Sequence, residues 1–142
     1  MPNLSPIPPE DSIRAFVCAL SGHSKVHSAT RRDGTYLLDV VLRTGTTLLV
    51  QMTNIYVVGT ADVIEVLSQN ATVGAIVTLS AWNMVSSEAR DFGRGRGVGV
   101  FTWREMFGAL NYKKYWLYEP IPLELDPKNA DRERHRRRRA WN

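Results

Sequence analysis

The sequence of 142 residues contains a single cysteine, Cys18, so no intramolecular disulfide can form. Apolar residues flank this cysteine, which predicts a buried thiol in a protein from a reducing compartment. A catalytic thiol is the less favoured alternative, because no histidine stands with Cys18 in a recognisable motif.

Long hydrophobic runs are also lacking. The apolar runs are all much shorter than the roughly 18 residues that a membrane-spanning helix needs. The first residues, MPNLSPIPPEDS, have neither the basic region nor the apolar core of a signal peptide. We therefore expect a soluble, cytoplasmic protein that does not bind membranes.

Excess positive charge is missing from most of the chain. The net charge of +4 is accounted for by residues 131–142, DRERHRRRRAWN, whereas basic and acidic residues balance elsewhere. Such a composition predicts a disordered tail over residues 127–142, because like charges repel and little apolar surface can be buried. The tail would contact phosphates through Arg136, Arg137, Arg138 and Arg139. The alternative is a solubilising end without a function.

Hydrophobic residues make up 44% of the chain, which is enough for the core of one domain. Four of the seven prolines fall within residues 1–9, so we expect an extended arm there. The domain would then span residues 10–126.

Hydrophobic spacing predicts a helix over residues 9–20, with Asp11 or Ser12 as its cap and Cys18 within it. Two hairpin turns, at residues 32–34 and 43–46, separate three strands between residues 25 and 58. Further on we expect a helix at 60–70 with Ile64 facing inward, a strand at 73–81, a helix at 83–93, a strand at 98–103 and a helix at 104–111.

Connection lengths predict how these strands pair. Short turns join antiparallel strands, whereas helical crossovers join parallel strands through right-handed connections. The expected fold is therefore α/β: a three-layer sandwich with a central mixed sheet, in which an antiparallel meander is followed by parallel strands.

The glycine-rich stretch FGRGRGVGVF, residues 92–101, suggests a phosphate-binding loop. Such loops run from a strand into a helix N-terminus, whereas this one runs from a helix into a strand. The pattern favours a helix C-cap followed by a closely packed strand. Arg94 and Arg96 remain candidates for contact with a nucleic-acid phosphate.

Two short motifs and the order of the elements carry a family resemblance. The motif DGTYLLDVVL places Asp39 on the strand after a glycine-bearing turn, and VQMTN places a polar-x-polar triplet on the next strand. Together with the elements through residue 110, these features resemble the restriction-endonuclease-like superfamily, also called PD-(D/E)xK nucleases. The likeness is greatest to its Mrr-like and archaeal Holliday-junction-resolvase branches.

This resemblance implies a metal site. Asp39 and Gln51 would be side-chain ligands of Mg²⁺, and the carbonyl of Met52 would be the third ligand. Thr53 occupies the position of the family's catalytic lysine, and threonine has neither the charge nor the basicity for that role. Glu65 could be a relocated ligand, and a cation could come from Lys25, Arg31, Arg32 or Arg43.

We therefore expect a restriction-endonuclease-like domain with a degraded metal site that acts as a nucleic-acid-binding or assembly module and forms a homodimer. DNA or RNA phosphates would contact the basic residues outside the tail: Arg31, Arg32, Arg43, Arg94 and Arg96. One alternative is an active endonuclease with a relocated lysine that requires Mg²⁺. Others are a protein-interaction subunit, or a sheet in which Asp39 and Gln51 are ordinary polar residues.

Two further motifs have competing interpretations. The spacing of His23 and His27 favours a surface pair over metal ligands. The segment YKKYWLY, residues 112–118, alternates aromatic and basic residues as single-strand binders do. A lid packed on the core or a dimer contact is the favoured interpretation, since aromatic residues are enriched at interfaces.

Overall fold

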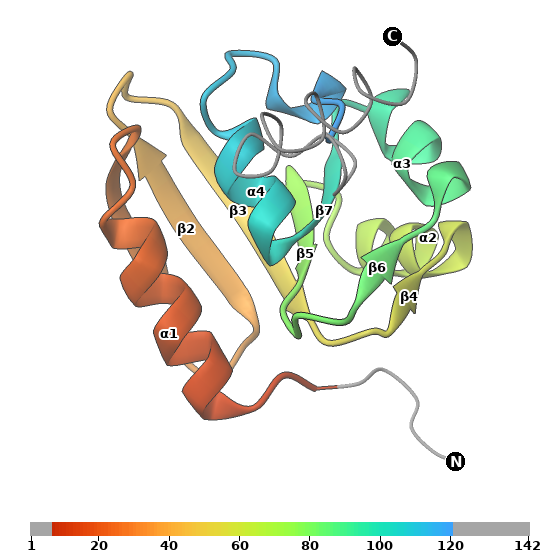
Figure 1. Cartoon of the computed structure of the whole chain (residues 1–142), viewed down its shortest axis with the longest axis horizontal. Helices are drawn as coiled ribbons and strands as arrows, with labels where there is room; N and C mark the ends of the chain where they lie inside the picture. Colours follow the sequence, from red (N-terminus) through yellow and green to blue (C-terminus); the bar gives the residue numbers. More distant parts are fainter. Residues whose placement is uncertain (1–6, 121–142) are drawn as a thin grey trace, which may run out of the picture.

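A computed structural model describes residues 7–120 of the protein (Figure 1). The elements, in chain order, are α1 (Glu10–Ser21), β1 (Val26–Arg31), β2 (Leu37–Leu42), β3 (Thr47–Thr53), β4 (Val57–Val58), α2 (Thr60–Gln69), β5 (Ala75–Thr78), β6 (Met84–Val85), α3 (Ser87–Arg94), β7 (Gly99–Thr102), α4 (Trp103–Ala109) and the 3₁₀ helix η1 (Tyr115–Leu117). The predictions for residues 1–6 and for the arginine-rich tail lie outside the described residues.

Helix α1 forms as its hydrophobic spacing predicts, but it begins differently. Ile13, Phe16 and Leu20 are buried on one face. The helix follows Pro9, whose carbonyl accepts the backbone N–H of Ile13 at 3.0 Å, and no side chain caps it. The predicted cap at Asp11 or Ser12 is therefore wrong. Pro9 is the N-cap residue and has no side-chain acceptor, so the N–H groups of the first turn receive no side-chain hydrogen bond.

The two predicted hairpins are confirmed. β1 pairs antiparallel with β2, and β2 pairs antiparallel with β3. Gly34 and Gly45 lie in the two turns with φ of 72° and 93°, a region that glycine occupies without steric cost.

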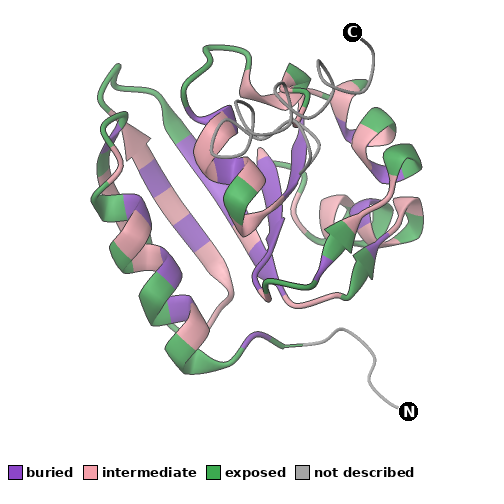
Figure 2. Cartoon of the chain, in the orientation of Figure 1, coloured by how far each residue is buried: buried purple, intermediate pink, exposed green. Residues whose placement is uncertain are grey.

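The main sheet has five strands in the order β1-β2-β3-β5-β7, with parallel pairing from β3 to β5 and from β5 to β7. One core lies between this sheet and the helices α1 and α4, and the other lies between the sheet and α2 and α3. The expected mixed α/β sheet is confirmed, and its two covered faces are compatible with a three-layer fold. Figure 2 shows the buried residues along the central strands.

The segment predicted as a helix at residues 83–93 divides into two elements. Met84 and Val85 pair in parallel with Val57 and Val58, which makes the small sheet β4–β6. The helix α3 starts only after Ser86, whose hydroxyl accepts the N–H of Ala89 at 3.1 Å. The pairing with β4 keeps Met84 and Val85 extended, and the cap at Ser86 starts the helix directly after them. The helix is therefore shorter than predicted.

Two inward-facing predictions are wrong. Cys18 is exposed, and the side chain of Ile64 is 49% exposed. Cys18 lies on the far side of α1 from Phe16 and Leu20, since two helical residues span about 200°. On α2 only Val63 is fully buried, and Leu67 is partly buried.

The structure of the glycine-rich stretch, residues 92–101, confirms that it caps a helix and leads into a strand. α3 ends at Arg94, Gly95 caps it, and Gly97 has a φ of 72° before β7 begins at Gly99. Gly93 is buried where α3 meets the chain entering β7. A Cβ atom there would lie 2.5 Å from the carbonyl oxygen of Val98.

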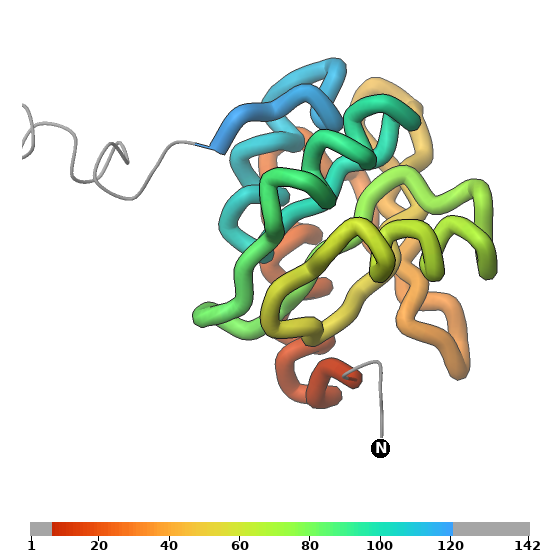
Figure 3. The backbone as a smooth tube through the Cα atoms, turned by 90° about the vertical axis from the view of Figure 1, so that its right-hand side faces the viewer, coloured from red at the N-terminus to blue at the C-terminus, as the bar shows by residue number. Residues whose placement is uncertain are grey.

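Figures 1 and 3 place the loops at the two ends of the sheet. The α1–β1 loop, the β2–β3 hairpin and the α4–η1 segment lie at the end where β3, β5 and β7 begin.

Within residues 7–120, no helix combines the length and hydropathy that crossing a membrane requires.

Candidate functional site

Asp39 and Gln51 lie on the same face of the sheet. Leu37 stands directly opposite Gln51, and Asp39 stands directly opposite Leu49. Side chains alternate along a strand, so Asp39 and Gln51 are diagonal neighbours, at a typical Cα separation of roughly 7–8 Å. The strand register thus brings the two predicted side-chain ligands to one face.

They do not share one cavity. An open cavity of about 250 Å³ lies beside Gln51, Met52 and Thr53, between β3 and α2, and the described residues that line it do not include Asp39. The described lining residues also include Asp62 and Glu65, and none of them is a lysine or an arginine. This electrostatic composition repels phosphate rather than attracting it.

The carboxylate of Asp39 is paired with a guanidinium. Arg32 donates from Nε to Oδ2 at 2.8 Å and from Nη2 to Oδ1 at 3.0 Å. This hydrogen bonding lowers the pKa of Asp39 below its ordinary value and raises that of Arg32. A metal ion that bound both oxygens of Asp39 in the plane that Arg32 now occupies would have to displace Arg32.

The amide of Gln51 is oriented by the backbone. Its Nε2 donates to the carbonyl oxygens of Tyr36 at 3.3 Å and of Met52 at 3.2 Å. The Met52 carbonyl, the predicted third ligand, therefore already accepts a hydrogen bond from Gln51. The amide oxygen is the atom left to accept a hydrogen bond or to bind a cation.

Thr53 ends β3 and is 7% exposed. Its hydroxyl oxygen accepts the backbone N–H of Ile55 at 3.4 Å, and its carbonyl accepts the N–H of Leu79 at 3.0 Å. Thr53 therefore accepts backbone hydrogen bonds at the end of β3, and its side chain carries no charge.

Asp62 and Glu65 are the acidic residues that line the cavity together with Gln51. Asp62, which approaches the cavity from α2, accepts the backbone N–H of Gly59 at 2.8 Å and stabilises the start of that helix. Glu65 is exposed on the same helix. Residues 7–120 contain no cluster of three or more His, Cys, Asp or Glu side chains placed to hold a metal.

Four of the arginines predicted to bind nucleic acid have partners within the protein. Besides Arg32, Arg31 pairs with Glu10 at 2.7 Å and donates to the carbonyl of Thr35. Its guanidinium also lies 5.2 Å from the ring centre of Tyr36.

The arginines of the glycine-rich stretch are also held. Arg94 pairs with Asp91 at 3.0 Å and with Glu119. Arg96 stacks on the ring of Phe92, with its guanidinium carbon 3.7 Å from the ring centre. Arg136, Arg137, Arg138 and Arg139 lie outside the described residues.

Arg43, the remaining predicted arginine of the described region, belongs to a group of cations that form no ion pair within residues 7–120. Its backbone N–H donates to the carbonyl of Lys25 at 2.9 Å, so these two exposed residues are neighbours. Lys113 and Lys114 are exposed on the α4–η1 segment, at the same end of the molecule (Figure 3). Within residues 7–120 none of the four forms an ion pair, and we call them the basic end.

His23 is not part of a surface pair. Its Nε2 lies 2.9 Å from the carbonyl of Phe107, and its Nδ1 accepts the backbone N–H of Lys25 at 3.0 Å. The ring therefore joins the α1–β1 loop to α4, and both nitrogens are engaged. His27 is exposed on β1.

A polar cluster at the carboxyl ends of β3 and β5 has no signal in the sequence. Asn54 Oδ1 accepts from the N–H of Ser80 at 3.0 Å, from its hydroxyl at 2.6 Å and from Asn83 Nδ2 at 2.9 Å. Asn83 is buried and also donates to the hydroxyl of Thr78 at 2.8 Å. These bonds fix the loop that leads into β6. Asn54 is 26 and 29 positions from its two partners, so only the fold brings them together.

Comparison with protein-family models, curated proteins and solved structures found no match to this chain. The resemblance of its motifs to the restriction-endonuclease-like superfamily therefore stays a prediction.

Proposed function

We propose that this protein is a nucleic-acid-binding module of the restriction-endonuclease-like type whose metal site has lost its chemistry. The observation that carries the proposal is the bidentate Arg32–Asp39 pair. Arg32 neutralises the carboxylate of Asp39, the predicted metal ligand. Thr53, which stands where the family has its catalytic lysine, supplies no positive charge. The phosphate backbone would instead be held at the basic end.

The charge distribution supports binding away from the sheet face. The described residues that line the cavity beside Gln51 include two carboxylates and no cation, whereas Lys25, Arg43, Lys113 and Lys114 lie at one end of the molecule and form no ion pair within residues 7–120. Cations without intramolecular partners can neutralise phosphates without first breaking an ion pair.

Affinity measured across a salt series tests the proposal on the full-length chain. We expect the affinity for DNA or RNA to fall as salt rises, and the double substitution Lys25→Ala/Arg43→Ala to weaken binding. The slope of log affinity against log salt should shrink by about 0.7–0.9 for each phosphate that the variant no longer neutralises. The control is Arg14→Ala, which removes an exposed cation already paired with Asp11. Affinity that is independent of salt would contradict the proposal.

Removal of residues 131–142 tests the contribution of Arg136, Arg137, Arg138 and Arg139. If the tail contacts phosphates, the truncated chain binds more weakly and with a smaller salt slope. Unchanged affinity would restrict the binding surface to the basic end.

One observation favours an active nuclease as a second candidate. Asp39 and Gln51 lie on the same face of the sheet, as two ligands of one metal must, and Arg32 would supply the cation in place of the missing lysine. Plasmid nicking with Mg²⁺ or Mn²⁺ separates the two candidates. We expect none from the wild-type chain; metal-dependent nicking that disappears in Asp39→Asn and in Arg32→Gln would establish the nuclease.

An apolar face supports the assembly part of the proposal. Tyr56, Val57, Trp82 and Met84 are between 43% and 72% exposed, and Val57 pairs with Met84 in the β4–β6 sheet. Residues 54–61 and 79–87 contain no charged side chain. We infer that a second copy of the chain covers this face, because a two-fold interface would then bring no like charges together.

A further inference from the structure

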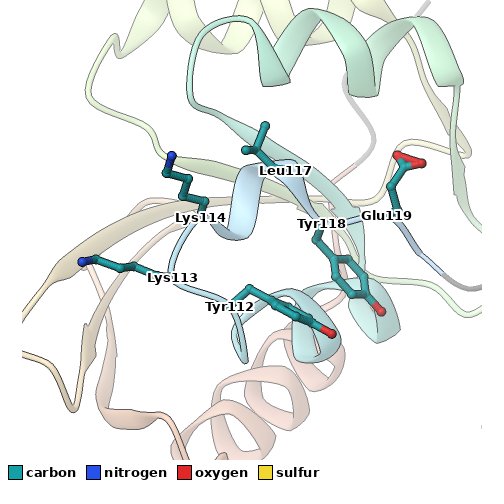
Figure 4. Close-up of a pocket in the computed structure, with 6 residues that line it drawn as sticks. All are labelled: Tyr112, Lys113, Lys114, Leu117, Tyr118 and Glu119. Atoms are coloured by element: carbon teal, nitrogen blue, oxygen red, sulfur yellow. The ribbon is translucent and has the colours of Figure 1, made fainter.

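We propose that the hollow between the end of α4 and η1 binds an unpaired nucleobase, so that the protein prefers single-stranded nucleic acid. This inference rests on the proposed function and names its substrate class. The hollow has a volume of about 490 Å³, within the roughly 300–1,000 Å³ typical of small-molecule sites. Figure 4 shows the side chains that line it: Tyr112, Lys113, Lys114, Leu117, Tyr118 and Glu119.

Two tyrosine rings supply flat apolar surface. The ring centres of Tyr112 and Tyr118 are 5.6 Å apart, with the planes tilted by 34°. Tyr112 is 60% exposed and Leu117 is 49% exposed. Exposed aromatic and aliphatic groups gathered in one hollow are a feature of binding surfaces, and every base has a face that can stack on an aromatic ring.

Tyr118 gives the hollow a fixed wall. Its ring packs edge-on against the buried Phe101, with centres 6.5 Å apart. It also fits closely over Gly108, where a Cβ atom would lie 2.4 Å from the tyrosine oxygen. A wall held in this way loses little conformational freedom when a base binds.

The charge of the hollow suits an anion. Lys113 and Lys114 form no ion pair within residues 7–120, and Figure 4 shows both pointing away from Glu119. The carboxylate of Glu119 is paired with Arg94, so its charge is compensated. A ligand that combines a planar ring with negative charge matches this arrangement, and a nucleotide of a single strand has both.

Tyr115, rather than Tyr112, attaches this segment to the body of the protein. Tyr115 donates from its hydroxyl to the carbonyl of Gly74 at 3.0 Å, and burial raises its pKa to about 12. Tyr115 therefore holds the segment on the body of the protein. Tyr112 is not needed for that contact and is free to bind a ligand.

A second copy of the chain fits this hollow less well than a nucleic acid does. A two-fold axis passing through the hollow would bring Lys113 and Lys114 of one copy near the same residues of the other, and like charges repel. A phosphate backbone would instead neutralise them.

Fluorescence anisotropy on the full-length chain tests the inference with three probes of equal length: oligo(dT), an abasic strand with the same phosphates, and a duplex. We expect oligo(dT) to bind most tightly at a fixed salt concentration. Tyr112→Ala should weaken its binding roughly 5- to 150-fold, the usual effect of losing one stacked base, and should leave abasic binding nearly unchanged. Tyr112→Phe should retain the preference.

Ile64→Ala is the control, because Ile64 is 49% exposed on α2, outside both the hollow and the β4–β6 face. It should bind oligo(dT) as the wild type does, and the thermal unfolding of both alanine variants should match the wild type. Salt-dependent binding without preference for bases, or equal weakening for oligo(dT) and the abasic strand in Tyr112→Ala, would overturn the stacking inference alone. No binding to any probe would overturn the proposed function as well. A change of oligomeric state in Tyr112→Ala without a change in affinity would assign the hollow to a protein contact and overturn it too.

Discussion

At the scale of single residues, the Arg32–Asp39 pair makes a prediction about pH. The pKa of Asp39 is lowered in the folded state, chiefly by hydrogen bonds from Arg32. The unfolded chain therefore binds a proton more readily, and the stabilisation by this pair is present above about pH 4 and is lost as the pH falls through the folded-state pKa.

Asp39→Asn should flatten this part of the stability–pH profile. Both side chains are partly exposed, so we expect a loss of no more than about 1 kcal/mol in unfolding free energy at pH 7. Urea unfolding between pH 3 and pH 7 measures it. Arg32→Gln, which removes the partner of Asp39, should flatten the same part of the profile, and an unchanged profile would contradict the pair.

Gly93 makes a second prediction at this scale. A Cβ atom would lie 2.5 Å from the backbone oxygen of Val98 and 2.8 Å from a methyl group of Val100. Gly93→Ala should therefore lower the free energy of unfolding by about 1–3 kcal/mol, although alanine is the better helix former. In the control Gly22→Ala the nearest contact is an ordinary 3.6 Å, so stability should be unchanged or slightly higher. Equal effects of the two substitutions would contradict the close approach of α3 and β7.

At the scale of elements, one ion pair joins α3 to the start of α4. Arg90 donates to both oxygens of Glu105 at 3.2 Å, and the side chains are only 14% and 21% exposed. Glu105 also accepts the backbone N–H of Thr102 at 3.0 Å, which completes the cap of α4.

Either Arg90→Ala or Glu105→Gln should lower the free energy of unfolding by about 1–3 kcal/mol, because each leaves a partly buried charged group without its main partner. The double variant should lose less than the sum of the two single variants, with a coupling energy of about 0.5–3 kcal/mol. A double-mutant cycle measured by chemical unfolding tests this. Strict additivity would mean that the pair does not couple the two helices.

At the scale of the whole molecule, the apolar β4–β6 face predicts self-association. Light scattering should give a mass of twice the 16.0 kDa chain. Trp82 is 72% exposed, so Trp82→Ser should shift the protein towards monomer without unfolding it. Leu117→Ser alters an exposed leucine on the α4–η1 segment and should leave the mass unchanged. A monomeric wild type would contradict the proposed dimer.

Local patterns predicted most of the elements because each reports a local physical preference. The turn glycines at positions 34 and 45 marked both hairpins, and the apolar run around Ile76 marked a strand that is buried on both faces. The β4–β6 pairing was missed because two-residue strands lack a hydrophobic period that can be detected. Their partners lie 27 positions apart in sequence.

The mixed sheet could be predicted from connection lengths, since short turns impose antiparallel pairing and helical crossovers impose parallel pairing. The state of the candidate site depends on contacts that form only in the folded protein. The turn between β1 and β2 places Arg32 beside Asp39, so the carboxylate meets a guanidinium. The folding of the chain after α4 places the hydroxyl of Tyr115 against the body of the protein and leaves Tyr112 facing solvent. The partner of each of these side chains is determined by how the chain packs in three dimensions. Residue type and sequence spacing alone do not predict that partner.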